Sequence, residues 1–374
     1  MRKQLLITGL LAILSSKVMA GGSCGNDCTW DLTDGMLTIS GTGSMTDYKS
    51  YTKVPWYSQR SSITSVQVSN GITSIGNYAF QGTTSLTSVT IPDSVTSIGQ
   101  NAFTGATGLT SINIPDSVTS IGASAFNNTT SLTSINIPKG VTSIADAAFY
   151  GTKSLTSITI PEGVTSIGGN AFRETGLTSV TIPDSVTSIE RYAFQNARSL
   201  TSINIPEGVT SIGESAFQGT TSLTSINIPE GVTSIGRRAF DDTGLTSINI
   251  PDSVTFIGAY ALAGVHLTDV TIPDTAVLEV YEGFGPFGRL VEFGGTIHCA
   301  GVLAQCQANM AAAGYEVGTY NMVQAPYSKK QANGSRVYYD ANGKLIGYQG
   351  KRIYTVKEAN EVAGKKNTLK IRYK

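Results

Sequence analysis

Neutral polar side chains recur in the sequence at a spacing that predicts one exposed row. They occupy the fifth position of a repeated unit as Thr or Asn, and their hydroxyl and amide groups donate and accept hydrogen bonds without carrying charge. Such a row suits the binding of glycans or protein backbone. The alternative is a ladder that only packs across strands and keeps the surface soluble. The eight residues that we predict as the ligand face are Thr90, Asn113, Asn136, Thr159, Thr181, Asn204, Asn227 and Asn249.

A second row of side chains is acidic and follows a recurring proline. Carboxylates stacked in a row repel one another unless solvent or cations screen them. Because Asp suits turns and the Gly after each Glu permits a positive φ, we interpret the row as turn chemistry, with weak cation binding as the alternative. The row comprises Asp93, Asp116, Lys139, Glu162, Asp184, Glu207, Glu230, Asp252 and Asp274, so one of its nine members is basic.

Residues suited to catalysis or to metal binding are sparse. His266 and His298 lack the spacing of metal ligands and are not flanked by a nucleophile motif. No phosphate-binding loop or nucleotide fingerprint is present. We therefore expect no enzyme activity, no cofactor and no metal site. The four cysteines form two close pairs, Cys24/Cys28 and Cys299/Cys306. Four cysteines allow three pairings, of which we favour the one within each close pair.

The polar rows belong to a repeat of 22 or 23 residues, which must position them. Prolines recur at this step from Pro92 to Pro273, and core phenylalanines follow from Phe80 to Phe240, with Leu262 in the ninth place. In each unit, apolar residues at positions one, four and six predict a strand, which the proline ends because it cannot donate a ladder hydrogen bond. A second short extended segment follows, and the Ala-Phe pair predicts a short helical or bent piece.

One unit has too few apolar side chains to offset the entropy of ordering its backbone. Neighbouring coils must therefore stack, so that each covers the next. A fixed period of 20 to 29 residues with a leucine-type core pattern is the signature of a solenoid.

The unit LTSVTIPDSVTSIGQNAF, which begins at Leu86, resembles the BspA-like (Treponema-type) leucine-rich repeat. Residues 24–25, 29–30, 35–45 and 54–57 resemble the amino-terminal region of the same family. Together these stretches cover roughly residues 24–284. The resemblance implies a β-rich (α+β) repeat solenoid, a right-handed leucine-rich-repeat coil of parallel strands with short helical turns, capped at both ends.

The same resemblance implies a bacterial surface or secreted protein, since some members of the family act as adhesins toward host or neighbouring-cell molecules. One departure concerns a position shortly after the Phe, where the family often has Cys. Here that position is occupied by Thr, as in Thr83, Thr129 and Thr152. The departure changes packing in the outer loop and leaves the fold prediction unchanged.

The chain divides into five predicted segments. The first has a basic start at Arg2 and Lys3, an apolar run and a small residue at Ala20, as a secretory signal does. Export would make disulfides possible. The segments are 1–20, a signal peptide; 21–62, an amino-terminal cap; 63–284, the solenoid; 285–327, a carboxyl-terminal cap with a short helix at 305–315; and 328–374, a small basic module.

The basic module has twelve Lys and Arg residues and three acidic ones within residues 329–374, a net charge of +9. Its Asn333-Gly334 and Asn342-Gly343 pairs are hairpin signals, and a helix is predicted at 355–364. We interpret the module as a solvated basic cap, with attachment to an anionic cell-surface polymer as the alternative. We expect no nucleic-acid partner and no membrane span.

These features predict a secreted or cell-surface binding protein. Its partners would be extracellular proteins or glycans of a host or a neighbouring cell, bound in the manner of an adhesin. The alternative is a structural surface-layer or scaffold protein without a specific ligand.

Overall fold

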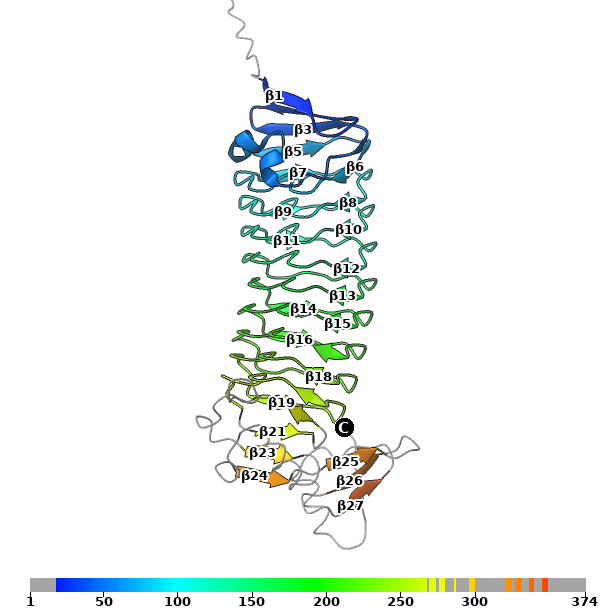
Figure 1. Ribbon diagram of the computed structural model, residues 1–374, viewed down its shortest axis with the longest axis vertical. Helices are drawn as coiled ribbons and strands as arrows, with labels where there is room; N and C mark the ends of the chain where they lie inside the picture. Colours follow the sequence, from blue (N-terminus) through cyan, green and yellow to red (C-terminus); the bar gives the residue numbers. More distant parts are fainter. Residues whose placement is uncertain are drawn as a thin grey trace, which may run out of the picture.

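The computed structural model describes residues 18–267, 269–273, 276–279 and 286, and the strands Thr296–Cys299, Asn321–Gln324, Tyr327–Lys330, Arg336–Tyr339 and Leu345–Tyr348. Through the repeats the chain winds into flat coils that stack in one column (Figure 1). The predicted parallel-strand solenoid is confirmed. Within the described part of the chain, no helix is long and apolar enough to cross a membrane.

The first strands of successive units pair in parallel in three runs, called here together the first ladder. Equivalent positions pair with each other, for example Ser65 with Ser88 and Val66 with Val89. Two coils contribute only single bridges, at Thr159 and Asn227. The strands are β5 (Ser65–Val68), β7 (Ser88–Thr90), β9 (Ser111–Ile112), β11 (Ser134–Ile135), β14 (Ser179–Thr181), β16 (Ser202–Asn204), β19 (Ser247–Asn249) and β21 (Asp269–Ile272).

The segment after each proline builds a second ladder, again with equivalent residues paired, as Ser97 with Ser120. Its strands are short because the proline turn precedes them and the Phe turn follows. They are β6 (Ile72–Ile75), β8 (Ser97–Ile98), β10 (Ser120–Ile121), β12 (Ser143–Ile144), β13 (Ser166–Ile167), β15 (Ser188–Ile189), β17 (Ser211–Ile212), β18 (Ser234–Ile235), β20 (Phe256–Ile257) and β22 (Val277–Leu278).

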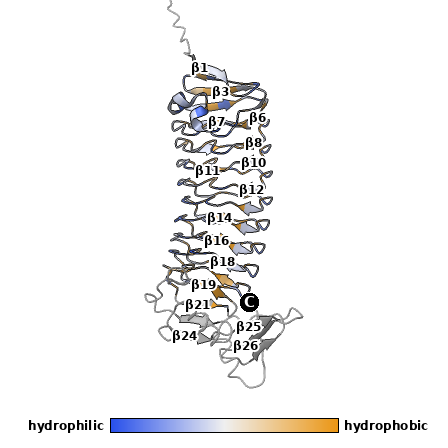
Figure 2. Cartoon of the chain, in the orientation of Figure 1, coloured by the Kyte–Doolittle hydropathy of each residue, from blue (hydrophilic) through white to orange (hydrophobic). Residues whose placement is uncertain are grey.

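The core of the column is a stack of phenylalanine rings. The eight rings from Phe80 to Phe240 are fully buried, and the centroids of neighbouring rings are 5.2–5.7 Å apart. Leu, Val and Ile side chains of both ladders complete each layer. Apolar and polar residues accordingly alternate along every coil (Figure 2). Each coil therefore buries its apolar residues against the coils on either side, as the repeat pattern predicts.

The segment around each Phe differs from the expected short helical piece, because it is a run of tight turns. The residue two positions before each core Phe or Leu262 has a left-handed backbone conformation, with φ between 53° and 62°. The N–H of Phe103 donates instead to the carbonyl of Ala125 in the next coil, at 2.8 Å. Because these donors pair between coils, they are not available for helical bonds. The result is a third ladder, called here the turn ladder.

The Thr that stands in place of the family's Cys is buried and hydrogen-bonded. Thr83 Oγ1 donates to the carbonyl of Phe80 at 2.7 Å, and Thr152 Oγ1 donates to that of Phe149 at 2.8 Å. Thr129 reaches back to the carbonyl of Phe103 at 3.1 Å. In Thr83 and Thr152 the hydroxyl therefore closes the turn after the Phe, and in Thr129 it joins two coils. This departure is accommodated without a change of fold.

The amino-terminal cap begins both main ladders. Strands β1 (Val18–Ser23), β2 (Cys28–Thr33) and β3 (Met36–Gly41) are antiparallel, and β3 then pairs in parallel with β5. β4 (Gly43–Ser44) pairs with β6, and two 3-10 helices, η1 (Tyr51–Lys53) and η2 (Tyr57–Ser62), follow. A disulfide joins Cys24 to Cys28. Trp30 and Trp56 pack edge to face over the open end of the phenylalanine stack.

The first ladder continues beyond residue 284. β21 pairs in parallel with β23 (Thr296–Cys299), which pairs with β24 (Asn321–Gln324). In the basic module, β25 (Tyr327–Lys330), β26 (Arg336–Tyr339) and β27 (Leu345–Tyr348) form an antiparallel sheet, and each Asn-Gly pair falls between two of its strands. Cys306, Asp274 and the helices expected at 305–315 and 355–364 lie outside the described residues, as does most of the predicted signal peptide.

Candidate functional site

The predicted ligand face lies on the first ladder, and all eight of its residues are exposed. Five of them, from Thr159 to Asn249, pair residue by residue in successive coils. Strands in a sheet lie about 4.8 Å apart, so the row repeats at that spacing. The Ser two residues before each Thr or Asn points the same way, because side chains alternate along a strand. The face is thus a two-column lattice of small neutral groups.

A neighbouring column of Thr hydroxyls is already engaged within the protein. At position two of the unit, Thr87 Oγ1 donates to the carbonyl of Thr64 at 3.0 Å, and Thr201 repeats this contact with Thr178. The Thr hydroxyls of the second ladder do the same, as Thr233 does with Thr210. These hydroxyls lock one coil to the previous one. The side chains at positions three and five are therefore the ones best placed to meet a ligand.

Asn136 is an exception within the predicted row. Its Nδ2 donates to the carbonyl of Ile114 at 2.7 Å, and its Oδ1 accepts from the N–H of Ile114 at 3.0 Å. The amide thus satisfies the backbone of the preceding coil, and the described pairing of β11 with β9 ends one residue earlier, at Ile135. Asn136 is exposed, yet its amide has a structural role that the residue type alone did not reveal.

The acidic row follows the proline turns as expected, and its described members are exposed. Among the described residues, no group of three or more His, Cys, Asp and Glu side chains is close enough to hold a metal ion. Where Ser follows the acid, its hydroxyl is committed to the previous coil: Ser117 Oγ donates to the carbonyl of Val95 at 2.7 Å. These contacts support the interpretation of the row as turn chemistry.

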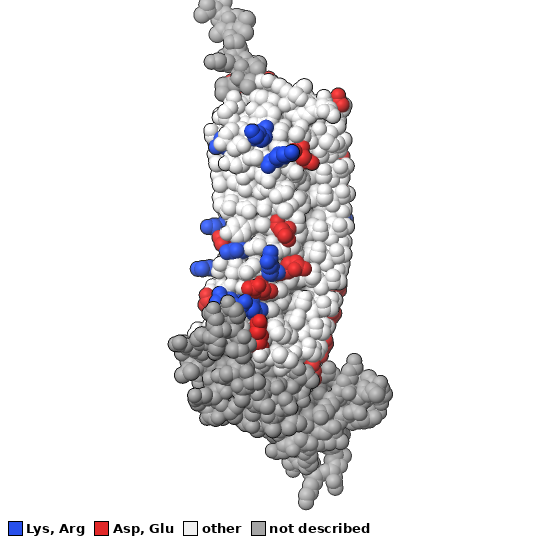
Figure 3. Space-filling model, viewed as in Figure 1, with Lys and Arg blue, Asp and Glu red and all other residues white. Residues whose placement is uncertain are grey.

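A further surface was not predicted and surrounds the turn ladder. We define the turn face as the outward side chains within four positions of each core Phe. Around Phe80, Phe103 and Phe126 this face has no charged residue. From Asp146 to Asp242 it has six basic and six acidic residues, namely Lys153, Arg173, Arg191, Arg198, Arg237 and Arg238, and Asp146, Glu174, Glu190, Glu214, Asp241 and Asp242. Figure 3 shows charged side chains of both signs gathered over these coils.

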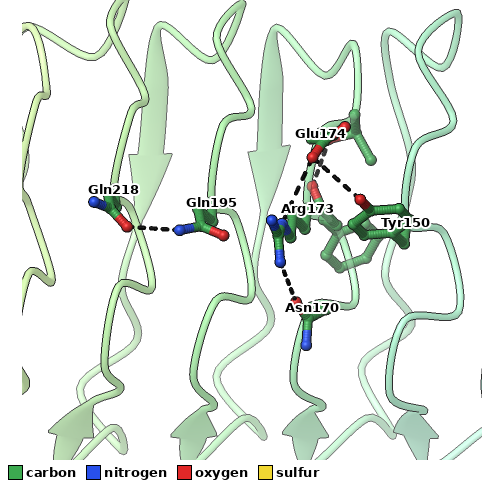
Figure 4. Close-up of polar contacts among 8 residues, drawn as sticks. Tyr150, Asn170, Arg173, Glu174, Gln195 and Gln218 are labelled. Carbon is green, nitrogen blue, oxygen red and sulfur yellow. Dashed lines mark hydrogen bonds and ion pairs between the residues drawn. The ribbon is translucent and has the colours of Figure 1, made fainter.

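Arg173 is at the centre of one cluster on the turn face (Figure 4). Its guanidinium lies 5.4 Å from the ring centroid of Tyr150 and 6.0 Å from that of Tyr192, so it sits against aromatic rings of the coils before and after. Its Nη1 donates to Asn170 Oδ1 at 3.2 Å, and its Nε is 3.7 Å from Glu174 Oε1. Burial and the neighbouring Glu174 carboxylate raise the pKa of Tyr150.

A chain of amides continues this cluster along the column. Gln195 Nε2 donates to Gln218 Oε1 at 2.6 Å (Figure 4). Gln218 Nε2 in turn donates to Asp241 Oδ2 at 2.9 Å. Burial raises the pKa of Asp241, while the Gln218 bond opposes that shift. All three residues directly follow a core Phe, so they form a row in successive coils. The signal for this surface was present in the sequence, because the residue after Phe varies from coil to coil while the strand positions hardly vary.

Comparisons with known proteins bear on the fold of this chain. Residues 55–176 and 165–281 match the family model described as BspA type Leucine rich repeat region (6 copies). No curated protein sequence matches the chain. A solved leucine-rich repeat protein from Bacteroides ovatus is 22% identical, with 86% of this chain and 69% of that chain covered and a TM-score of 0.52.

Two further solved structures are similar to this chain. A leucine rich cell surface protein from Faecalibacterium prausnitzii is 26% identical, with 84% of this chain and 97% of that chain covered and a TM-score of 0.48. The pneumococcal vaccine antigen PcpA is 16% identical, with 83% and 99% covered and a TM-score of 0.50. The likeness to PcpA and to the Bacteroides ovatus protein extends to the fold alone.

Proposed function

The chain belongs to the BspA-type leucine-rich-repeat family, and from that membership we propose that it is a secreted or cell-surface, adhesin-like protein that binds extracellular proteins or glycans. The observation that carries the proposal is the first-ladder face, where eight exposed Thr and Asn residues stand at equivalent positions of successive coils. Solenoids use extended sheet faces of this kind as binding surfaces.

The chemistry of the face favours a neutral, extended ligand. Its outward positions are Ser, Thr and Asn, which form hydrogen bonds and provide no charge to steer an ionic partner. Each contact is weak because water competes for it. Many equivalent contacts made by one ligand nevertheless add up, since the second and later contacts are intramolecular. A glycan chain or an extended stretch of protein backbone meets this requirement.

Export is part of the same proposal. Residues 1–20 have the pattern of a signal peptide, and the Cys24–Cys28 disulfide suits an oxidising compartment. Cleavage after Ala20 would leave residues 21–23 of β1 to pair with β2. In the alternative to a solvated cap, the basic module, with its net charge of +9 over residues 329–374, would attach the protein to an anionic surface polymer.

Lysine substitutions on two exposed rows test the binding face. In the full chain, Thr181→Lys, Asn204→Lys and Asn227→Lys together would place three bulky charges on the first-ladder face. Glu162→Lys, Asp184→Lys and Glu207→Lys are a control at exposed positions of the acidic row. The probes are immobilised neutral polysaccharides and extracellular-matrix proteins.

We expect saturable binding of the unsubstituted protein to at least one probe, a loss of roughly tenfold or more in the first-ladder variant, and near-normal binding in the control. Equal losses in both variants would place the ligand elsewhere. Binding to none of the probes would favour the scaffold alternative.

A further inference from the structure

The two exposed faces differ in one respect that bears on recognition. Successive coils repeat the same chemistry on the first-ladder face, so a ligand there has several equivalent positions along the column. The turn face has a unique sequence of residues in the coils from Phe149 to Phe240. A partner that binds this face can therefore be held in a single register, which identical rungs cannot provide.

Two adjacent coils at the centre of the turn face have charges that are complementary when a second copy runs in the opposite direction. In the Phe194 coil, Glu190, Arg191 and Arg198 give a net charge of +1, and in the Phe217 coil Glu214 alone gives −1. The coils on either side of this pair, those of Phe172 and Phe240, each have as many basic as acidic residues. When a second column runs in the opposite direction, its Phe217 coil, with a charge of −1, can therefore lie against the Phe194 coil, with a charge of +1.

We propose that the turn face is the interface of an antiparallel homodimer, whose two-fold axis passes between the Phe194 and Phe217 coils. In this arrangement Arg191 faces the partner's Glu214, since both residues stand three positions before their core Phe. Arg173 faces the partner's Asp241, since both directly follow a core Phe, and one position further on Glu174 faces the partner's Asp242. These outer coils therefore contribute one pair of opposite and one pair of like charges, and the net attraction comes from Arg191 and Glu214. Gln195 and Gln218 lie next to the axis in the same row. The symmetry doubles each of these contacts.

Exposure and size support a protein interface here. Arg191 and Glu214 are exposed, and Arg173 and Glu174 are about one-third exposed. The Phe rings of the five charged coils are 5.3–5.6 Å apart, so the four spacings between them extend the face roughly 22 Å along the column. Tyr and Arg, which flank one another at Tyr150, Arg173 and Tyr192, are the residues that most often dominate such interfaces.

The balance of charge argues for a second copy over an ionic polymer. With six basic and six acidic residues, the face offers no net attraction to a strongly anionic or cationic chain. Its central coils do attract a second copy that runs in the opposite direction, because Arg191 then meets the partner's Glu214. The backbone N–H groups of the turns are bonded to the next coil, for example Phe217 to Ala239 at 2.8 Å, so contact must be made by side chains.

Sedimentation velocity of the full chain, with charge-reversal variants, tests the dimer. We expect a dimer whose dissociation constant rises roughly tenfold or more with Arg191→Glu or with Glu214→Arg, because each change sets like charges together twice. The double variant Arg191→Glu/Glu214→Arg restores the dimer, because it exchanges the two members of the pair.

Asp116→Arg, an exposed member of the acidic row, is the matched control and leaves the dimer unchanged. Raising the salt to 1 M weakens the unsubstituted dimer, because the Debye length falls to about 3 Å.

Thermal unfolding of each variant checks that the fold is kept, and the double variant serves the same purpose within the series. A protein that stays monomeric at high micromolar concentration would overturn the proposal. So would a dimer that neither single substitution weakens, or one that the double variant does not restore. A monomer that loses binding to a glycan or protein probe on Arg191→Glu would also overturn it, and would assign the turn face to that ligand.

Discussion

The indole ring of Trp56 stacks on the ring of Phe80, with centroids 6.0 Å apart and planes 22° from parallel. Trp56 thereby extends the phenylalanine stack by one ring into the amino-terminal cap. Its Nε1 also donates to the carbonyl of Ala79 at 2.8 Å, so the same side chain covers the apolar end of the column and satisfies a backbone acceptor there.

Trp56→Ala is expected to destabilise the protein by about 3–5 kcal/mol, because it removes a buried aromatic ring and leaves a cavity above Phe80. Denaturant unfolding measures the loss. Tyr51→Ala, at a nearby exposed residue, is the control and should change the free energy of unfolding by less than about 1 kcal/mol. Equal effects of the two substitutions would contradict the role of Trp56 as the end of the stack.

Loss of the Cys24–Cys28 disulfide is expected to weaken the cap rather than the whole column. The closed loop is short, so its effect on the unfolded chain is worth about 2 kcal/mol. In the Cys24→Ser/Cys28→Ser variant, hydrogen exchange should quicken in β2 and β3, while amides near Phe149 stay protected. Faster exchange throughout the solenoid would show that the cap and the column open together.

Asn136→Asp is expected to cost about 1–2 kcal/mol, because the carboxylate cannot donate to the carbonyl of Ile114. Asn136→Thr is the milder change, since Thr159 and Thr181 occupy the same position and pair through the backbone. It should stay within about 0.5 kcal/mol of the unsubstituted protein. Urea unfolding of the two variants makes the comparison. A Thr variant as unstable as the Asp variant would mean that the row cannot form a backbone bridge at this coil.

The half-buried carboxylate of Asp241 is expected to make the protein less stable as pH rises. Its folded pKa lies above the ordinary value of 3.8, so the folded state holds the proton more tightly than the unfolded chain. Stability from this group is present below the unfolded pKa and is lost as pH rises through the folded pKa. Asp241→Asn removes that dependence and keeps an acceptor for Gln218. Stability measured from pH 3 to pH 7 should show the difference, and parallel curves would contradict it.

The sequence predicted the strands and the core well because their signals repeat. Proline marks the end of every first-ladder strand, and the same apolar positions recur in each unit, so the exposed row from Thr90 to Asn249 followed from the alternation of side chains along a strand. The hydrogen bonds of the Asn136 side chain to Ile114 could not be predicted from the sequence. Other Asn residues of the row have the same neighbours in sequence.

The turn ladder was missed for a different reason. Left-handed residues are usually recognised by Gly, yet the position two before Phe is occupied by residues such as Tyr78, Ser124, Ala147 and Arg238, all with φ of 53–62°. Their conformation is imposed by hydrogen bonds between coils, which no single unit can reveal. The charged turn face corresponds to the positions of the unit that vary most between coils. The repeat pattern does not predict it, because that pattern is defined by the uniform strand positions.

The turn ladder also gives the column a polarity. Its N–H groups all point toward the carboxyl-terminal end, as those of Arg238, Phe240 and Asp242 do in bonding to the Leu262 coil. Because these peptide groups are aligned, their dipoles add. At the carboxyl-terminal end of the column, the N–H groups of the last coil have no further coil to bond to and would lack acceptors without a cap. The Leu262 N–H instead meets the carbonyl of Pro286, at 2.8 Å, and the Ala259 N–H meets the carboxylate of Glu279, at 2.9 Å. The last coil must therefore be followed by hydrogen-bond acceptors, whereas the first coil needs a donor, which Trp56 supplies.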